Sequence, residues 1–447
     1  MGKKKIRWLF LLSVILASTS GQIAMGQAPQ VVRATPDHAD VDVSSELTEI
    51  RIEFSEAMKQ DGFSVCGGGP SFPELGGKPK WIDSKTFSIP VRLQENREYS
   101  LSINCQSNQN FRNAAGMPAR IHPISFRTAE KNAKIKTPAP AENEQAIAAL
   151  RKAILEQYSY VDLRKVDWNS RFDEFQGQLK NAPTSAAFAR TAAEMLSVAK
   201  DTHVSIQDNG FQLSSYRESW PSPNFNGRIL SKYMGDLKQH NNVVATGKLE
   251  SGAGYVLIGS WGGDEASIVP ALDFIDQHAG DEAIVIDVRP NGGGNELLAR
   301  QVAGCFTDMP IVYSKHKNRE SQNPSGFSKV FDRIVEPNPK RKHFGGKVLV
   351  LMGPTNMSSN ESFLLMMRET KNCTLIGERS FGSSGNPKPH DLGNGVTVNL
   401  PSWQDLFPEG TLLEGRGIDP KIKVATSAKD LTTRDAVLEA AIQQLKK

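Results

Sequence analysis

The sequence predicts a multidomain protein with an N-terminal β-sandwich, a helical subdomain and a C-terminal α/β core. Three observations predict this arrangement. The chain has 447 residues, which is long enough for more than one domain. Apolar residues alternate with a period of two before residue 130, and they recur at helical spacing between residues 147 and 199. After residue 254 they form short continuous runs, which are typical of buried strands.

Residues 1–27 are predicted to be a secretory signal peptide. Three lysines and Arg7 precede an apolar run at residues 8–17, and small residues precede Gln27. The run is roughly half of the about 20 residues that a membrane span needs, and no later stretch is long enough either. No cysteine follows the run, which argues against a lipid anchor. We expect a mature protein that begins near Gln27, is secreted or periplasmic, and has no transmembrane span.

Charge and cysteine content exclude several classes of function. A net charge of +4 over this length gives no dense basic stripe, so nucleic acid is not expected as a partner. Export would place the four cysteines in an oxidising compartment. Cys66 and Cys105 lie in the first domain, and Cys305 and Cys373 lie in the second, so one bridge per domain is possible. None stands in a CxxC or Cys/His cluster, so neither a metal site nor a redox cofactor is expected.

Residues 28–130 are predicted to form the β-sandwich. Apolar residues alternate at 50–54, 87–93 and 99–103, with glycine-rich turns between the runs. This segment resembles the bacterial Ig-like domains that are appended to secreted proteins. The resemblance rests on the opening Thr35-Pro36, on FSEAM at 54–58 and on the closing FRT at 126–128. A spacer role is favoured over the binding of a partner or glycan.

The rest of the chain divides by composition. Residues 131–142 are rich in Lys, Ala and Pro, which predicts an extended linker. Two apolar stripes at helical spacing predict helices within residues 143–205. Residues 206–250 are predicted to be a polar connecting segment, and 251–447 to be the α/β core. The core's buried strands are expected at residues 255–258, 283–288, 348–352 and 374–376, with helices after the second and third.

The first segment that suggests chemistry is IDVRPNGGG at residues 286–294, a strand that runs into a glycine turn. Glycine lets the backbone approach a substrate carbonyl, and its N–H groups can stabilise the negative oxygen of a tetrahedral intermediate. A dinucleotide site is not indicated, because the GxGxxG spacing and its following acidic residue are absent. The segment resembles the IDLRxNxGG strand and turn of the tail-specific serine proteases, a family that includes the tricorn-like enzymes.

Residues 348–361, VLVLMGPTNMSSNE, resemble the VLvxxxTaSAxE pattern of the same family. The family nucleophile stands three residues before the glutamate, so the resemblance implies that Ser358 is the nucleophile. It also implies an oxyanion hole made by the N–H of Ser359 together with Gly293 or Gly294. A serine at a helix start is often only a cap, but the combination with the other segments favours catalysis.

His203 is the expected general base. GERSFGSSG at residues 377–385 resembles the GexTfGkg motif of the serine/lysine branch, but Ser383 stands at the lysine position. Lys388, between two prolines, is the available replacement. The tricorn-like branch uses a histidine instead, and DTHV at 201–204 resembles its DGHv motif, with a matching VDW segment upstream. A histidine is suited to accept the serine proton near neutral pH.

A group that orients the base is expected in LLEGRGIDP at residues 412–420, which resembles the stretch before the family's GxxPD turn. The resemblance implies Glu414, acting on His203 directly or through the hydroxyl of Thr202. The alternative is a surface carboxylate in a turn. The resemblance covers roughly residues 142–424. Residues 206–250 are too short for the PDZ module with which many members capture a C-terminal carboxylate.

Together these segments imply a crotonase-like (ClpP-like) protease core. The expected function is that of an exported serine endopeptidase, without a cofactor, that cleaves proteins or peptides through an acyl-enzyme. One alternative is a non-peptidase homologue that acts as a binding module of the cell envelope, since the lysine is absent and Thr202 replaces the glycine of the histidine motif. Another is an Ig-like adhesion protein with an incidental C-terminal domain.

Overall fold

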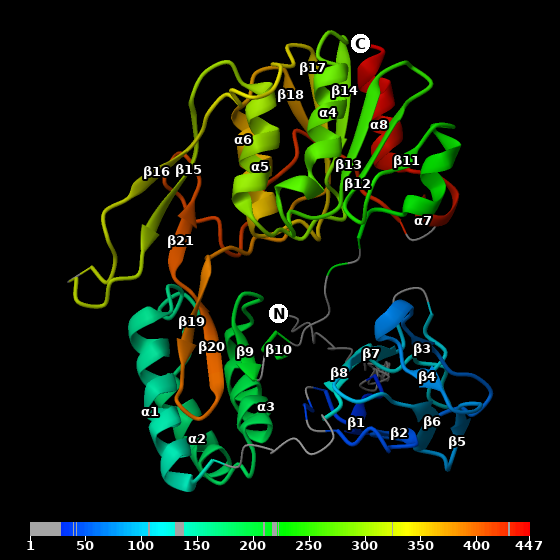
Figure 1. Ribbon diagram of the computed structural model, residues 1–447, viewed down its shortest axis with the longest axis vertical. Helices are drawn as coiled ribbons and strands as arrows, with labels where there is room; N and C mark the ends of the chain where they lie inside the picture. The colour runs from blue at the N-terminus through cyan, green and yellow to red at the C-terminus, as the bar shows by residue number, and fades with distance from the viewer. Residues whose placement is uncertain are drawn as a thin grey trace, which may run out of the picture.

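The computed structural model describes residues 28–447, apart from 39, 42, 106–107, 130–137, 209–210, 217–220, 222, 324 and 428–429. The predicted signal peptide and most of the predicted linker therefore lie outside the described residues. Figure 1 shows an α/β core at the top, a helical region at the lower left and an N-terminal β region at the lower right. Among the described residues, no helix is both long enough and apolar enough to cross a bilayer.

Two antiparallel sheets in the N-terminal region enclose one apolar core. The larger sheet has the order β1 (Val31–Thr35), β2 (Glu49–Phe54), β6 (Thr86–Arg92), β4 (Glu74–Leu75), with β5 (Lys80–Trp81) also beside β6. The smaller has the order β3 (Val65–Cys66), β7 (Glu98–Ile103), β8 (His122–Arg127), and η1 (Gly69–Ser71) lies between β3 and β4 in sequence. The period of two in β2 buries Ile50, Ile52 and Phe54 between the sheets, as predicted.

The cysteines form one disulfide, between Cys66 and Cys105 in the N-terminal region. Cys305 and Cys373 are free thiols in the α/β core. Of the two bridges that the sequence allowed, the structure therefore contains the first and not the second.

The helical region contains three helices and a four-stranded antiparallel sheet. The helices are α1 (Pro140–Gln157), α2 (Trp168–Lys180) and α3 (Ser185–Leu196), followed by η2 (Ser197–Ala199). The sheet order is β10 (Phe211–Ser214), β9 (Ser205–Asp208), β20 (Val396–Pro401), β19 (Pro387–Asp391). Helix α1 starts inside the predicted linker, because proline suits a first helical turn and the Glu142 carboxylate accepts the N–H of Ala139.

The hairpin β19–β20 lies far along the chain but belongs to the core of the helical region. Figure 1 shows it between α1 and α3. Leu392, Val396, Val398 and Leu400 pack in the same apolar cluster as the helices. The helical region is therefore built from two separated segments, and not from residues 143–205 alone as predicted. It also contacts the N-terminal region, where Arg190 on α3 forms an ion pair with Asp40.

The α/β core is built on a seven-stranded sheet whose two faces are both covered. Its order is β11 (Lys238–Gln239), β12 (Val244–Lys248), β13 (Gly254–Ile258), β14 (Ala283–Asp287), β17 (Lys347–Met352), β18 (Cys373–Gly377), β22 (Ile422–Lys423). The strands from β13 to β22 are parallel. Along β17, Val348 and Val350 face one apolar cluster while Leu349 and Leu351 face the other. The four predicted core strands are thus present.

Helices cover the sheet on both sides. On one face lie α4 (Val269–Gln277), α5 (Glu296–Ala303) and α6 (Ser359–Glu369), and on the other lie η3 (Gly227–Lys232) and α8 (Ala436–Leu445). The remaining short elements are η4 (Glu265–Ser267), η5 (Gly304–Phe306) and α7 (Asp430–Thr433). A separate three-stranded sheet has the order β16 (Phe331–Val335), β15 (Ile311–Asn318), β21 (Trp403–Leu406). Because β14 and β17 are parallel neighbours, the glycine turn and Ser358 follow them at the same edge.

Candidate active site

Ser358 stands on a sharp turn between β17 and α6. Its backbone has φ 55° and ψ −133°, a conformation that residues with a side chain rarely adopt. Such a conformation costs about 1–3 kcal/mol and is concentrated at functional sites. The Ser358 side chain makes no capping hydrogen bond to α6, so the simple cap considered from the sequence is not its role. The turn therefore presents a half-buried hydroxyl that has no hydrogen-bond partner among the described residues.

Gly293 lies directly against the Ser358 turn. A Cβ on Gly293 would be 2.9 Å from the Ser358 Cβ and 3.0 Å from the carbonyl oxygen of Met357, and φ is +114°. Only glycine fits this approach. However, the Gly293 N–H donates to Oδ1 of Asn291 at 2.9 Å. Gly293 therefore supplies close approach, while its N–H is already engaged and is not a free donor for an oxyanion.

Gly294 and Ser359 retain N–H groups that could serve as donors. The backbone N–H of Trp261 donates to the carbonyl of Gly293, and the Trp261 carbonyl accepts the N–H of Asn295. Neither bond involves the N–H or the carbonyl of Gly294, which lies between those two residues. The Gly294 carbonyl accepts the Ser359 hydroxyl at 2.6 Å, and its N–H has no partner among the described residues. The Ser359 N–H belongs to the first turn of α6, where intrahelical acceptors are lacking.

His203 is joined to the Ser358 turn through Ser383. Its Nδ1 lies 2.9 Å from the Ser383 Oγ and 3.4 Å from the Thr202 Oγ1, and the two hydroxyls are 2.5 Å apart. The Ser358 N–H donates to the carbonyl of Ser383 at 2.8 Å. The structure thus brings three of the predicted residues, Ser358, His203 and Thr202, around Ser383, a residue that the sequence analysis treated only as a missing lysine.

No hydrogen bond joins His203 to the Ser358 hydroxyl in the described part of the chain. Burial lowers the pKa of His203, while the nearby Asp201 carboxylate opposes that effect. The imidazole is therefore neutral near pH 7 and able to accept a proton. Lys388 is exposed on β19, where it pairs with Leu400 on β20 of the helical region.

Glu414 lies close to the site but does not contact the imidazole. One carboxylate oxygen accepts Arg164 at 2.5 Å, and the other accepts the N–H of Ser384 at 2.8 Å. Across the described chain, no hydrogen bond runs from Glu414 to His203 or to Thr202. The structure therefore places this carboxylate against the loop that carries Ser383, rather than in the direct orienting role expected from the sequence.

Arg164 connects Glu414 to the loop that carries His203. It pairs with Asp201 at 3.0 Å, and Asp201 accepts both the N–H of His203 at 2.9 Å and the Tyr158 hydroxyl at 2.6 Å. Burial raises the pKa of Glu414 well above its ordinary value, Asp201 raises it further, and Arg164 lowers it. This buried network fixes the histidine loop and the Ser383 loop relative to each other.

Glu361 also supports the site, although the sequence analysis gave it no role. Its carboxylate accepts three donors from the Ser383 loop: the Ser380 hydroxyl at 2.5 Å, the Gly382 N–H at 2.8 Å and the Ser383 N–H at 2.9 Å. Burial raises its pKa to about 8, and the three donors act in the opposite direction. The sequence could have indicated this supporting role, because Glu361 is the last residue of the segment that resembles the VLvxxxTaSAxE pattern.

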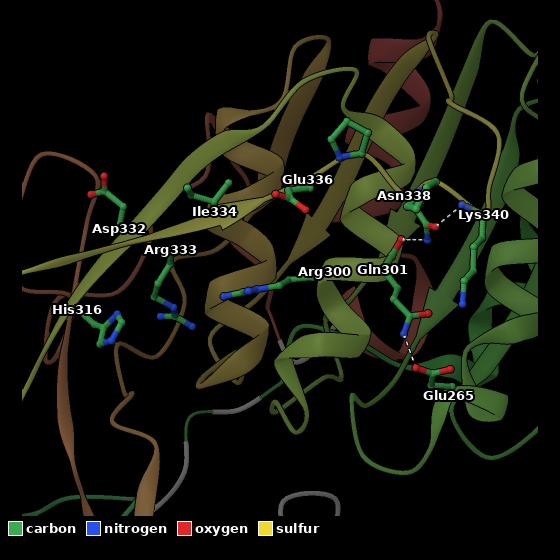
Figure 2. Close-up of a pocket in the computed structure, with 12 residues that line it drawn as sticks. Glu265, Arg300, Gln301, His316, Asp332, Arg333, Ile334, Glu336, Asn338 and Lys340 are labelled. Atoms are coloured by element: carbon green, nitrogen blue, oxygen red, sulfur yellow. Dashed lines mark hydrogen bonds between the residues drawn. The ribbon is translucent and has the colours of Figure 1, made fainter.

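A groove of about 640 Å³ lies between α5, the β15–β16 hairpin and the loop at residues 336–340. Figure 2 shows Arg300 and Arg333 in its middle part, with Glu265 and Lys340 at one end. None of the seven predicted site residues lines it. The groove adjoins the site through α6, since Arg333 donates to the Ser362 hydroxyl at 3.1 Å, one turn after Ser358.

The fold and the Ser358 turn define an α/β protein with a serine at a strained strand-to-helix junction, as in serine hydrolases. Residues 252–424 match the model of peptidase family S41. This match confirms the resemblance to the tail-specific proteases over that part of the chain.

Similar proteins agree with this assignment. Carboxy-terminal processing protease CtpB of Bacillus subtilis is 24% identical over 143 residues, which are 32% of this chain and 28% of that protein. The tail-specific protease of Haemophilus influenzae is 28% identical over 102 residues, 23% of this chain and 13% of that protein. The matches thus span less than a third of these curated relatives.

One solved structure, a candidate peptidase from Parabacteroides merdae, is 26% identical with a TM-score of 0.58. The superposition covers 69% of this chain and 97% of the Parabacteroides merdae chain, so the structural similarity extends beyond residues 252–424.

Proposed function

We propose that this chain is an exported serine endopeptidase that cleaves proteins or peptides through an acyl-enzyme on Ser358. His203 takes the Ser358 proton as the hydroxyl attacks the scissile carbonyl, and then returns it to the leaving amine. The N–H groups of Ser359 and Gly294 stabilise the negative oxygen of the tetrahedral intermediate. The core is of the crotonase-like type, and the N-terminal β region is an Ig-like spacer.

The observation that carries this proposal is the Ser358 turn. A positive φ at a serine is costly, and here it leaves the hydroxyl beside Gly293 without a partner in the part of the chain that the structure describes. A residue that only stabilised α6 would adopt ordinary backbone angles and bond to an N–H of the first turn. His203 is one residue away through Ser383, and catalytic hydrogen bonds that are long in a free enzyme shorten when substrate binds.

A fluorophosphonate probe tests the proposal directly. The purified mature chain should be labelled at Ser358, as located by peptide mass spectrometry, and Ser358→Ala should abolish labelling. Ser402→Ala is a matched control, because it also removes a serine hydroxyl, one bonded to the carbonyl of Asn386. Absence of labelling in the natural chain would favour the alternative of a non-peptidase binding module.

The identity of the base is tested by two further variants. His203→Ala should lower kcat by roughly 10³-fold or more, by analogy with the loss of a triad histidine. Lys388→Ala should change it little, since Lys388 is exposed on β19. The opposite ranking would assign the protein to the serine/lysine mechanism.

A further inference from the structure

We infer that Ser383 is a positioning residue that holds the imidazole of His203 in the orientation and tautomer needed for catalysis. The inference rests on the proposed function, because it assigns the orienting group for the same serine and histidine. The serine/lysine branch carries its lysine at this position. Here the same position provides a hydroxyl that serves a different base.

The contacts of Ser383 link both members of the pair. Its Oγ lies 2.9 Å from Nδ1 of His203 and 2.5 Å from the Thr202 Oγ1, and its carbonyl accepts the N–H of Ser358 at 2.8 Å. Thr202, which the sequence suggested for a bridging role, is 3.4 Å from Nδ1. Ser383 is therefore the closer hydroxyl to the ring.

Ser383 is itself held firmly. Only 2% of its surface is exposed, and its N–H donates to the buried Glu361 carboxylate. The other charged groups around the ring are committed elsewhere: Asp201 accepts the backbone N–H of His203, and Arg164 lies between Asp201 and Glu414. Within the described residues, no carboxylate oxygen bonds to the ring, so the orienting group is a hydroxyl.

The proton positions follow from the role of a base. His203 can accept the Ser358 proton only if Nε2 is free, so the neutral ring must carry its proton on Nδ1. Nδ1–H then donates to Ser383 Oγ, and the Ser383 hydroxyl donates to Thr202 Oγ1. When Nε2 takes the proton, Nδ1–H keeps its bond and Ser383 loses no proton. The reverse arrangement, in which Ser383 donates to Nδ1, leaves Nε2 protonated and inactive.

Labelling kinetics test the inference on the full mature chain. Ser383→Ala should lower the fluorophosphonate labelling rate at Ser358 by about 10–100-fold on the pH plateau, the worth of a hydrogen bond to a group that becomes charged. Ser383→Thr, which keeps the hydroxyl, should restore most of that rate. Ser215→Ala is the matched control, because it removes a buried hydroxyl that binds the carbonyl of Val204 in the histidine loop but does not touch the ring.

A second readout does not depend on activity. In ¹³C,¹⁵N-histidine NMR spectra, assigned to His203 with His203→Ala, the natural chain should show the Nδ1–H tautomer and Ser383→Ala a mixture. If Ser383→Ala shifts the tautomer but the natural chain is not labelled, the proposed peptidase function is refuted. The positioning of the His203 ring by Ser383 is then still supported. The role of Ser383, but not the peptidase function, would be overturned by a labelling rate that is unchanged in Ser383→Ala. It would also be overturned if Ser215→Ala reduced the rate equally and Ser383→Ala left the tautomer unchanged.

Discussion

Replacing Arg164 by methionine should destabilise the fold in a manner that depends on pH. The guanidinium lies between two buried carboxylates, 2.5 Å from Glu414 and 3.0 Å from Asp201. The exposed fractions of those two side chains are 3% and 0%. Methionine fills a similar volume but supplies no charge, so it leaves the two buried carboxyl groups without a counter-charge. Breaking a buried ion pair in this way typically costs about 3–5 kcal/mol.

The structure also indicates how the cost varies with pH. Burial and Asp201 already raise the pKa of Glu414, and Arg164 is the group that lowers it. Without Arg164 the folded pKa of Glu414 rises further, whereas in the unfolded chain it is about 4.3. Because its folded pKa is raised, stability is lost as pH rises above the unfolded pKa, by about 1.4 kcal/mol per pH unit. The natural chain shares this loss up to its own folded pKa, so the penalty for Arg164→Met should be about 3–5 kcal/mol and no smaller at pH 8 than at pH 5.

Urea unfolding of the full chain at the two pH values measures this difference. Arg379→Met is the matched control, since Arg379 pairs with Asp419 on the surface and both side chains are about half exposed. That variant should change the free energy of unfolding by less than about 1 kcal/mol at either pH. A penalty for Arg164→Met that is equally small, or that is smaller at pH 8 than at pH 5, would refute the reasoning about the buried network.

Three further predictions concern the site and the N-terminal region. Gly293→Ala should abolish labelling and lower the free energy of unfolding by about 1–3 kcal/mol, because its Cβ would lie 2.9 Å from the Cβ of Ser358 at φ +114°. Gly292→Ala is the control, because its Cβ meets nothing within 4 Å, and it should leave stability unchanged. The rate of labelling should fall as pH drops through the pKa of His203, which burial holds below its ordinary value of about 6.5. A rate that already falls above pH 7 would contradict the assignment of His203 as the base. The two cysteines of the Cys66–Cys105 disulfide are 39 residues apart in the sequence, so reduction should destabilise the N-terminal region by about 4 kcal/mol. An unchanged midpoint of urea unfolding after reduction would contradict this contribution of the disulfide.

The parts of the fold that the sequence predicted are those whose signal is local. The run at residues 348–352 is continuous and apolar because β17 is covered on both faces, and the alternation in β2 reflects one buried face. The strands β9 and β10 have four residues each, too few for a clear period, and they fell inside the predicted polar segment. The hairpin β19–β20, which begins at Pro387, packs with helices that end at Leu196 or earlier, and no local pattern records such a pairing.

The candidate site divides in the same way. Ser358 and His203 stand in recognisable motifs, so they could be named before the structure was seen. The role of Ser383 depends on three loops that meet in space, and the sequence showed only that a lysine was absent. Glu414 was predicted from a motif and bonds to the N–H of Ser384, but its partner Arg164 carries no motif.

Because the helical region is built from two separated segments, its assembly follows an order during synthesis. Its apolar cluster includes residues 392–400, so the three helices cannot complete their packing until the chain has emerged almost to its end. The loop at residues 382–384, which connects the histidine to the serine turn, leads directly into the same hairpin. A partly emerged chain therefore holds these two groups apart. The site is assembled only on a nearly complete polypeptide, so a growing chain carries Ser358 without the loops that surround it.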